Sequence, residues 1–275
     1  MKRYTVFGGR GFIGSEIVSM LEAAGQDVWV PPRDDESVFD TDLGIVIYSA
    51  GQGDCKNAPL GVFDANCRLL ADLLARGKFE RLLYVSSTRV YMNQDSSAEG
   101  DDLKVCSGDQ RRLFNLTKLV SEELCLKSGR DITIVRPSNV YGVALHSPLF
   151  LPAITRNAIN HGKVDMYIDH DYAKDYVSVM DVATTCIYLS KHPASLGKII
   201  NIASGFNVTA QQIADVLQEH TGCIINWNKI EYPNEVFPVT NISSLLSILP
   251  DYSPRNVLSD IESMIVEFKD KLMDL

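Results

Sequence analysis

The chain has 275 residues, of which 45% are hydrophobic, so it can bury a sizeable core and form one large domain or two unequal ones. Its 35 acidic residues outnumber its 26 lysines and arginines, which gives a formal net charge of −9. This balance argues against broad binding to nucleic acid or to an anionic membrane, and an anionic ligand would need a local basic pocket.

The cysteines and the N-terminal residues indicate which compartment and which kinds of site to expect. The six cysteines form no CxxC pair and have no histidines at zinc-like spacing, so reduced thiols and the absence of a metal site are expected. The apolar run near the N-terminus stops at Phe7, and no apolar stretch approaches the ~20 residues that span a bilayer. We therefore expect a cytoplasmic protein.

The first half of the chain alternates short β-branched runs with helical patterns, which is typical of a parallel sheet with crossover helices. The strands are predicted at residues 4–7, 28–30, 45–48, 82–85 and 132–135. The intervening apolar helical faces are formed by Ile13, Ile17, Leu21 and Ala24, ending at Gly25, and by Leu69, Leu70, Leu73 and Leu74. The predicted fold class is α/β, a Rossmann doubly wound parallel sheet.

Beyond Pro137 the pattern becomes irregular and prolines are frequent. Helices are predicted at residues 149–161, 182–191, 210–221 and 256–271. We assign residues 1–136 to a dinucleotide-binding Rossmann domain and residues 137–275 mainly to a smaller C-terminal substrate-binding lobe, with some segments able to return to the Rossmann domain. A ligand cleft is expected between the two.

A glycine-rich turn follows the first strand and opens the first helix. The glycines Gly8, Gly9, Gly11 and Gly14 satisfy both GxxGxxG and GxGxxG spacing. Glycine allows a tight turn and lets backbone N–H groups approach a pyrophosphate, which also lies at the positive end of the helix. The alternative, a turn that only packs helix on strand, is less consistent with the strand, turn and helix being in register.

The residues after the second strand bear on the choice of dinucleotide. An acidic residue normally holds the ribose hydroxyls there, but this chain has Pro32 and Arg33 before Asp34. Arg10, in the glycine turn, and Arg33 are therefore expected to contact a 2′-phosphate, which favours NADP(H). If both arginines are ordinary surface charges and Asp34 holds the ribose, the cofactor is NAD(H).

Several segments, in this order, resemble the extended short-chain dehydrogenase/reductase family, the NAD(P)-dependent epimerase/dehydratase group that acts on nucleotide-sugars. The resemblance covers nearly the whole chain. It is carried by the glycine turn at residues 8–14, Asn66, and the segments at 86–91 (SSTRVY), 114–118 (FNLTK), 136–142 (RPSNVYG), 174–183 (KDYVSVMDVA) and 201–205 (NIASG).

The resemblance implies roles for matching positions. Ser87 matches the hydroxyl that hydrogen-bonds the reacting sugar oxygen, and Lys118 matches the lysine that lowers the pKa of a catalytic tyrosine. For the cofactor it implies contacts from Gly8, Gly9, Arg10, Gly11, Phe12, Ile13, Gly14, Arg33, Ala50, Asn66, Ser86, Lys118 and Pro137. For the nucleotide-sugar it implies contacts from Ser87, Thr88, Asn139 and Lys174. Lys174 would offset the diphosphate charge, unless it is only a surface lysine.

The catalytic tyrosine of the family is absent, because its position holds Phe114. A phenylalanine ring has no ionisable oxygen and cannot move a proton, and loss of a general acid or base costs roughly 10²–10⁴-fold in rate. Either the natural protein is impaired or has changed function, or the chain is an engineered Tyr→Phe variant. The intact Ser87, Lys118 and glycine turn favour the engineered variant.

The reaction type is narrowed by the two residues after Ser87. Dehydratases of the family carry an Asp-Glu pair there, whereas this chain has Thr88 and Arg89, which disfavours dehydration. The leading hypothesis is NADPH-dependent reduction of a 4-keto nucleotide-sugar, and the alternatives are an NAD-dependent 4-epimerase or a non-catalytic NADP(H) sensor. The resemblance also implies a homodimer formed through helices at approximately 60–76 and 110–127.

Overall fold

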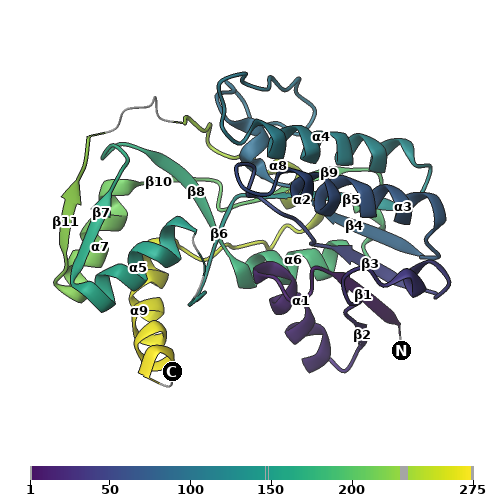
Figure 1. Cartoon of the computed structure of the whole chain (residues 1–275), viewed down its shortest axis with the longest axis horizontal. Coiled ribbons are helices and arrows are strands. Elements are labelled where there is room, and N and C mark those ends of the chain that lie inside the picture. Colours follow the sequence, from purple (N-terminus) through teal and green to yellow (C-terminus); the bar gives the residue numbers. More distant parts are fainter. Residues whose placement is uncertain (1, 146, 148, 230–234, 274–275) are drawn as a thin grey trace.

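The computed structural model describes residues 2–145, 147, 149–229 and 235–273, and it has a larger and a smaller part (Figure 1). The larger part is built on six parallel strands in the order β2-β1-β3-β4-β5-β9. These strands are β1 (Arg3–Phe7), β2 (Asp27–Trp29), β3 (Ile45–Tyr48), β4 (Arg81–Val85), β5 (Ile132–Pro137) and β9 (Ile199–Ile202). The predicted α/β doubly wound sheet is confirmed.

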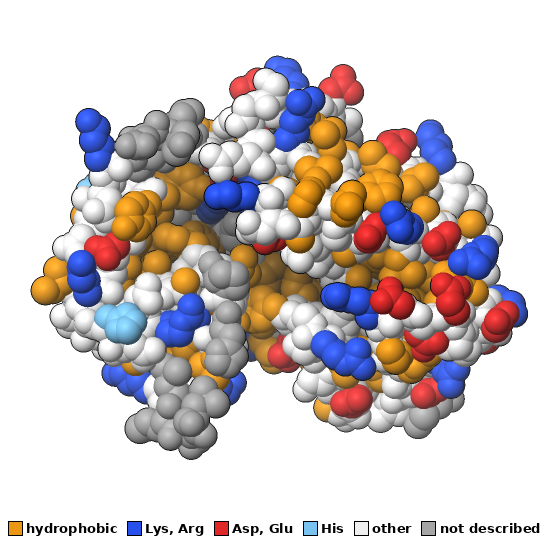
Figure 2. Space-filling model, in the orientation of Figure 1, with side chains coloured by type: hydrophobic (Ala, Val, Ile, Leu, Met, Phe, Trp, Pro, Cys, Tyr) orange, Lys and Arg blue, Asp and Glu red, His pale blue; other side chains and the backbone are white. Residues whose placement is uncertain are grey.

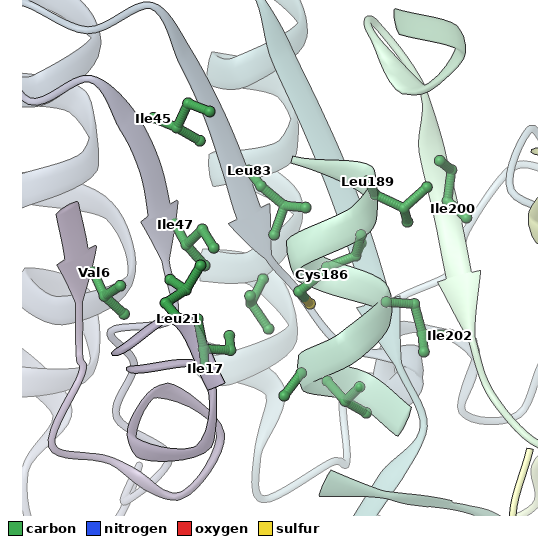
Figure 3. Close-up of a cluster of buried hydrophobic side chains, with 14 of the residues drawn as sticks. Val6, Ile17, Leu21, Ile45, Ile47, Leu83, Cys186, Leu189, Ile200 and Ile202 are labelled. Atoms are coloured by element: carbon green, nitrogen blue, oxygen red, sulfur yellow. The ribbon is translucent and has the colours of Figure 1, made fainter. Parts of the chain in front are cut away.

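Helices cover both faces of this sheet because successive side chains of a strand point to opposite faces. On one face, shown in Figure 3, Ile45 and Ile47 of β3 pack with side chains of three helices. On the other face, Val46 and Tyr48 pack with side chains of two more helices. The first group is α1 (Phe12–Ala23), α6 (Val179–Leu189) and α8 (Ser243–Ile248), and the second is α3 (Leu69–Arg76) and α4 (Arg112–Lys127). The sheet is therefore buried on both sides.

Five short elements lie in the connections between the strands and longer helices. They are the 3-10 turns η1 (Glu36–Phe39), η3 (Thr88–Tyr91) and η4 (Pro193–Ser195), the helix α2 (Pro59–Phe63) and the π-helical turn η2 (Asp64–Arg68). The chain crosses from one side of β1 to the other between β2 and β3. In open α/β sheets a ligand is expected beyond the carboxyl ends of the strands at such a switch point.

The smaller part has two short sheets, in the orders β10-β8-β6 and β11-β7. Its strands are β6 (Asn139–Tyr141), β7 (Lys163–Met166), β8 (Ala173–Ser178), β10 (Asn207–Thr209) and β11 (Ile224–Trp227). Its helices are α5 (Phe150–His161), α7 (Ala210–Thr221) and α9 (Val257–Met273). A second apolar core joins these helices and strands, and it includes Phe268 of α9 and Leu217 of α7.

The observed boundaries correct several sequence predictions. The second strand covers Asp27–Trp29 rather than residues 28–30, and α6 begins at Val179 rather than 182, because the Ser178 hydroxyl accepts a hydrogen bond from the backbone N–H of Met180 and caps the helix. The strands after Asn139 were not predicted individually, since most have only three or four residues. One of them, β9, pairs with β5 in the main sheet, and α6 and α8 also return to that sheet.

No helix in the described part of the chain is both long and apolar enough to span a bilayer.

Candidate functional site

The glycine turn lies between β1 and α1 and is packed too tightly for side chains. A Cβ on Gly14 would lie 2.1 Å from the carbonyl oxygen of Gly8, and a Cβ on Gly8 would lie 2.5 Å from the backbone nitrogen of Ala50. Gly8 also has a φ of 77°, which favours glycine. The turn is thus held against the residues that follow β3, which include Ala50.

The amino end of α1 is able to receive an anion. Gly11 is the N-cap and offers no side-chain cap, and the first turn contains no acidic residue. The first backbone N–H groups of a helix lack intrahelical partners and lie at the positive end of its dipole. Phe12 begins the helix, and Ile13 packs partly against the core on the sheet's α1 face. These residues fit a dinucleotide pyrophosphate.

The two arginines of the cofactor hypothesis are both exposed. Arg10 lies in the glycine turn, and Arg33 follows β2 and precedes Asp34, whose φ is 63°. Within the described residues, neither guanidinium has a hydrogen bond or an ion pair to another side chain. Both groups are therefore available to a ligand.

Ser87 stands at the carboxyl end of β4, where it caps the turn η3. Its Oγ accepts a hydrogen bond from the Arg89 backbone N–H at 3.1 Å, which leaves its own proton free to be donated. Thr88 beside it is buried. Ser86 points the other way, and its hydroxyl donates a short hydrogen bond to the buried carboxylate of Glu122.

Lys118 comes from α4 and lies buried beside the end of β4. Its Nζ donates to the carbonyl oxygen of Val85 at 2.9 Å and lies 5.7 Å from the centre of the Phe114 ring, one helical turn earlier. Burial lowers the pKa of Lys118 to about 8. Lys118 therefore connects the Phe114 ring with the end of β4, two residues before Ser87.

Asn66 joins this group from the π-helical turn η2. Its Nδ2 donates to Thr117 Oγ1 at 2.9 Å, and its Oδ1 accepts from the backbone N–H of Gln52 at 3.2 Å. A Cβ on Gly51 would lie 3.3 Å from Asn66 Oδ1 and 3.7 Å from Lys118 Nζ. Asn66 thus holds the segment after β3 against α4.

A buried ion pair between Arg136 and Glu122 connects the elements around the site. The Arg136 guanidinium binds both oxygens of Glu122, with Nε–Oε1 at 2.9 Å and Nη2–Oε2 at 2.5 Å, and its Nη1 donates to the Tyr91 hydroxyl at 2.6 Å. Tyr91 in turn donates to Asn201 Oδ1 at 2.9 Å. This network ties together α4, β5, η3 and β9.

The residues assigned to the sugar end lie partly in the smaller part of the molecule. Pro137 ends β5, and Asn139 in β6 donates from Nδ2 to the carbonyl oxygen of Asp175 at 2.8 Å. The buried Asp175 carboxylate accepts from Ser138 Oγ at 2.5 Å and from the backbone N–H groups of Ser204 and Gly205 at 2.9 and 2.7 Å. Asp175 therefore links the two parts.

Lys174 is half-buried and forms an ion pair with Glu235. Its Nζ lies 3.3 Å from Glu235 Oε2, and the rings of Tyr172 and Phe237 lie 4.9 and 4.8 Å away. Glu235 Oε1 accepts from Arg89 Nη2 at 2.6 Å, and the same Nη2 binds Asp109 Oδ1 at 2.8 Å. Lys174 is thus one member of a larger charged cluster.

We call Arg89, Asp109, Arg111, Lys174 and Glu235 the charged cluster. Arg111 belongs to it because its backbone N–H donates to Asp109 Oδ1 at 2.8 Å and its guanidinium lies 4.8 Å from the centre of the Phe114 ring. Sequence reasoning missed four of these residues. Only the spacing of Arg111 and Phe114, one helical turn apart, could have indicated a contact.

No group of three or more His, Cys, Asp or Glu side chains arranged to hold a metal ion occurs among the residues that are described. Figure 2 shows a hollow between the two parts of the molecule. A cavity of about 250 Å³ also lies between the parts, lined by residues of α1, α6 and α9 that include Phe12, Met180 and Asp260.

Comparison with known proteins adds relatives of known activity. The curated GDP-6-deoxy-D-talose 4-dehydrogenase of Aggregatibacter actinomycetemcomitans is 28% identical over 156 residues, which are 53% of this chain and 50% of that protein. The match thus spans about half the length of this relative.

Two solved structures have a similar fold. MoeE5, in complex with UDP-glucose and NAD, is 20% identical with a TM-score of 0.83, covering 98% of this chain and 99% of its own. UDP-N-acetylglucosamine 4-epimerase from Methanobrevibacter ruminantium M1, in complex with UDP-N-acetylmuramic acid, is 19% identical with a TM-score of 0.83 over 98% and 99% of the two chains.

A family model described as the NAD dependent epimerase/dehydratase family matches residues 4–203. This range contains the glycine turn, the six strands of the main sheet except Arg3, and Ser87, Phe114 and Lys118. The chain therefore belongs to the NAD dependent epimerase/dehydratase family of enzymes.

Proposed function

We propose that the chain is a nucleotide-sugar oxidoreductase scaffold that reduces a 4-keto nucleotide-sugar with NADPH and is limited by Phe114. The observation that carries this proposal is the position of Lys118, buried between the end of β4 and the Phe114 ring. A buried lysine is costly, so its retention beside Ser87 is best explained by a site for cofactor and sugar. The 4-dehydrogenase named above supports chemistry at the sugar 4-position.

Ser87, Lys118 and Phe114 would have different roles in this reaction. A reduced dinucleotide, when bound, would supply the hydride. Ser87 would donate its free hydroxyl proton in a hydrogen bond to the sugar oxygen, because its Oγ already accepts from Arg89. Lys118, with two N–H groups beyond the one bound to Val85, would orient the cofactor ribose. Phe114 can pack against the ligands but cannot transfer a proton.

Restoring the phenol tests this function. Phe114→Tyr should raise turnover of a 4-keto nucleotide-sugar with NADPH by at least ~10²-fold with little change in KM, since the hydroxyl acts mainly in the transition state. The measurement is NADPH absorbance across 4-keto UDP-, dTDP-, GDP- and CDP-sugars. Phe79→Tyr, which adds the same atom before the amino end of β4, is the control.

The outcomes separate the three candidate functions. Net NADPH consumption by Phe114→Tyr supports the reductase. Interconversion of sugar epimers without net consumption supports the epimerase instead. If the tyrosine variant binds dinucleotide and sugar but converts none of the panel, the sensor hypothesis replaces the reductase.

The preference for NADP(H) is part of the proposal. Arg10 and Arg33 are exposed and without protein partners among the described residues, which leaves both able to bind a 2′-phosphate. NADPH should bind more tightly than NADH, and Arg33→Ala should remove most of the difference, because a charge-assisted hydrogen bond contributes about 1.5–3 kcal/mol. Isothermal titration calorimetry measures both affinities, and equal values in the unmutated chain would refute this preference.

A homodimer through the helices at approximately 60–76 and 110–127 is also part of the proposal. Leu116, Val120 and Leu124 form an exposed apolar stripe along α4, next to the exposed Leu60 and Phe63 of α2. Figure 2 shows hydrophobic side chains gathered over this region. Val120→Lys should shift the protein from dimer to monomer in analytical ultracentrifugation, and a monomeric parent chain would argue against this interface.

A further inference from the structure

The charged cluster holds one more cation than it can neutralise. Asp109 and Glu235 are its carboxylates, and Arg89, Arg111 and Lys174 are its cations. Arg89 pairs with both carboxylates and Lys174 pairs with Glu235, so both cations have partners. Among the residues described, no carboxylate forms an ion pair with the Arg111 guanidinium.

The ion pairs of Glu235 with Arg89 and Lys174 persist near neutral pH. Burial alone would raise the pKa of Glu235, but the hydrogen bond from Arg89 and the charge of Lys174 lower that pKa to about 2. Glu235 therefore stays ionised and bound near neutral pH. Arg111 is an exposed residue, but desolvation of its guanidinium by the surrounding chain, and then the like charge of Arg89, lower its pKa. An anion that reaches Arg111 would thus relieve repulsion between two guanidinium groups.

The geometry leaves the Arg111 donors free. Its Cζ lies 4.8 Å from the centre of the Phe114 ring, a cation–π contact that does not consume N–H groups. A guanidinium donates within its own plane, in a fork that matches the two oxygens of a carboxylate. Arg111 can therefore rest on Phe114 and still bind a carboxylate with two hydrogen bonds.

The position of Arg111 identifies which part of a substrate it would meet. Phe114 and Ser87 border the place where the sugar ring reacts in the proposed function, and Arg111 contacts Phe114 directly. The neighbouring Arg89 is fixed to Ser87 through its backbone N–H. An anion held by Arg111 would accordingly belong to the sugar ring rather than to the diphosphate.

We propose that Arg111, resting on Phe114 beside Arg89, binds a carboxylate on the sugar ring, so that the substrate is a nucleotide-linked sugar acid. This inference rests on the proposed nucleotide-sugar function. Arg111 is then a specificity-determining residue.

The test compares sugars that differ only in the acid group. Affinities are measured by isothermal titration calorimetry, in the presence of NADP⁺, for two pairs: UDP-glucose with UDP-glucuronate, and GDP-mannose with GDP-mannuronate. For the nucleotide that the protein binds, UDP or GDP, the sugar acid should bind at least about tenfold more tightly than the neutral sugar. Arg111→Gln should reduce this ratio to about one, and Arg111→Lys should retain part of it.

The control is Arg112→Gln, which removes the same charge from the adjacent, exposed residue of α4 and should leave the ratio unchanged. Equal affinities for acid and neutral sugar in the parent chain would overturn the inference. So would an equal loss of both affinities in Arg111→Gln, which would assign Arg111 to the diphosphate. If no member of either pair binds, this inference is overturned, whereas the nucleotide-sugar function is decided separately by the Phe114→Tyr assay on sugars of all four nucleotides.

Discussion

The proposed site has a cofactor end, at the glycine turn, and a sugar end, at the charged cluster, and the two ends are held by different forces. At the cofactor end, the backbone approaches itself so closely that Gly8 and Gly14 have no room for a side chain. At the sugar end, ionised side chains from distant segments hold one another, as in the contact between Arg89 and Glu235. Steric exclusion tolerates almost no substitution, whereas a charged cluster can exchange partners when a ligand arrives.

This difference indicates which residues of the site can be substituted. The glycine turn is required by any dinucleotide, because a Cβ there would displace either the backbone or the ligand. None of the residues of the charged cluster belongs to a strand of the main sheet. Phe114, Arg89 and Arg111, the residues that distinguish this site chemically, all lie at the sugar end.

The largest effect is expected from breaking the cofactor end. Gly14→Ala places a methyl group 2.1 Å from the Gly8 carbonyl oxygen, so α1 must move away from β1. We expect a loss of about 3 kcal/mol in unfolding free energy and no measurable dinucleotide binding. Urea denaturation and calorimetry check both effects. Gly108→Ala, where a Cβ meets nothing within 4 Å, is the control and should behave as the parent chain.

A second test concerns Lys118, which lies where the two ends meet. Burial lowers its pKa from 10.5 to about 8, so below pH 8 the folded protein carries a poorly solvated charge. Between about pH 8 and 10.5 the unfolded chain binds more protons at this lysine, and stability from this group should rise with pH.

Lys118→Met should therefore be more stable than the parent chain at pH 7, by up to about 3 kcal/mol. The difference should shrink as the pH rises from 8 to 10.5. Thermal unfolding over this range provides the measurement. Lys127→Met, at the exposed end of the same helix, should show no such trend, and a constant difference for Lys118→Met would contradict the explanation.

The smallest effect is expected from loosening the sugar end. Glu235→Gln removes the carboxylate shared by Arg89 and Lys174, and because its side chain is 33% exposed the expected loss of stability is only about 1 kcal/mol. The pKa of Glu235 is depressed, so this contribution is present above pH 4.5 and is lost as the pH falls toward 2.

Dinucleotide affinity should stay within about twofold of the parent value in Glu235→Gln, since the glycine turn needs no charge at the sugar end. Calorimetric titration with NADPH measures this affinity. Glu123→Gln, at an exposed position of α4, is the matched control. A large loss of NADPH affinity would mean that the two ends are coupled after all.

The sequence predicted the main sheet and the glycine turn because their determinants are local. A short continuous run of β-branched and aromatic residues identifies β3, and the glycine spacing identifies the turn before α1. The grouping of Ser87, Phe114 and Lys118 was implied by the family resemblance and stays a prediction, although the contact of Lys118 with Phe114 follows from their spacing of one helical turn. The charged cluster could not be predicted, since Glu235 meets Arg89 across 146 residues and no periodicity encodes that contact. The short strands after Asn139 offered too few residues for a pattern.

The return of β9 to the main sheet has a consequence for how the molecule is made. Residues 199–202 complete the edge beside β5, yet they follow most of the strands and one helix of the smaller part along the chain. During synthesis the edge of β5 therefore stays unpaired until about residue 202 has left the ribosome. Contacts between distant segments form slowly, and open strand edges favour aggregation. A fragment ending near residue 136 would keep that edge permanently, which makes it a poor candidate for separate expression.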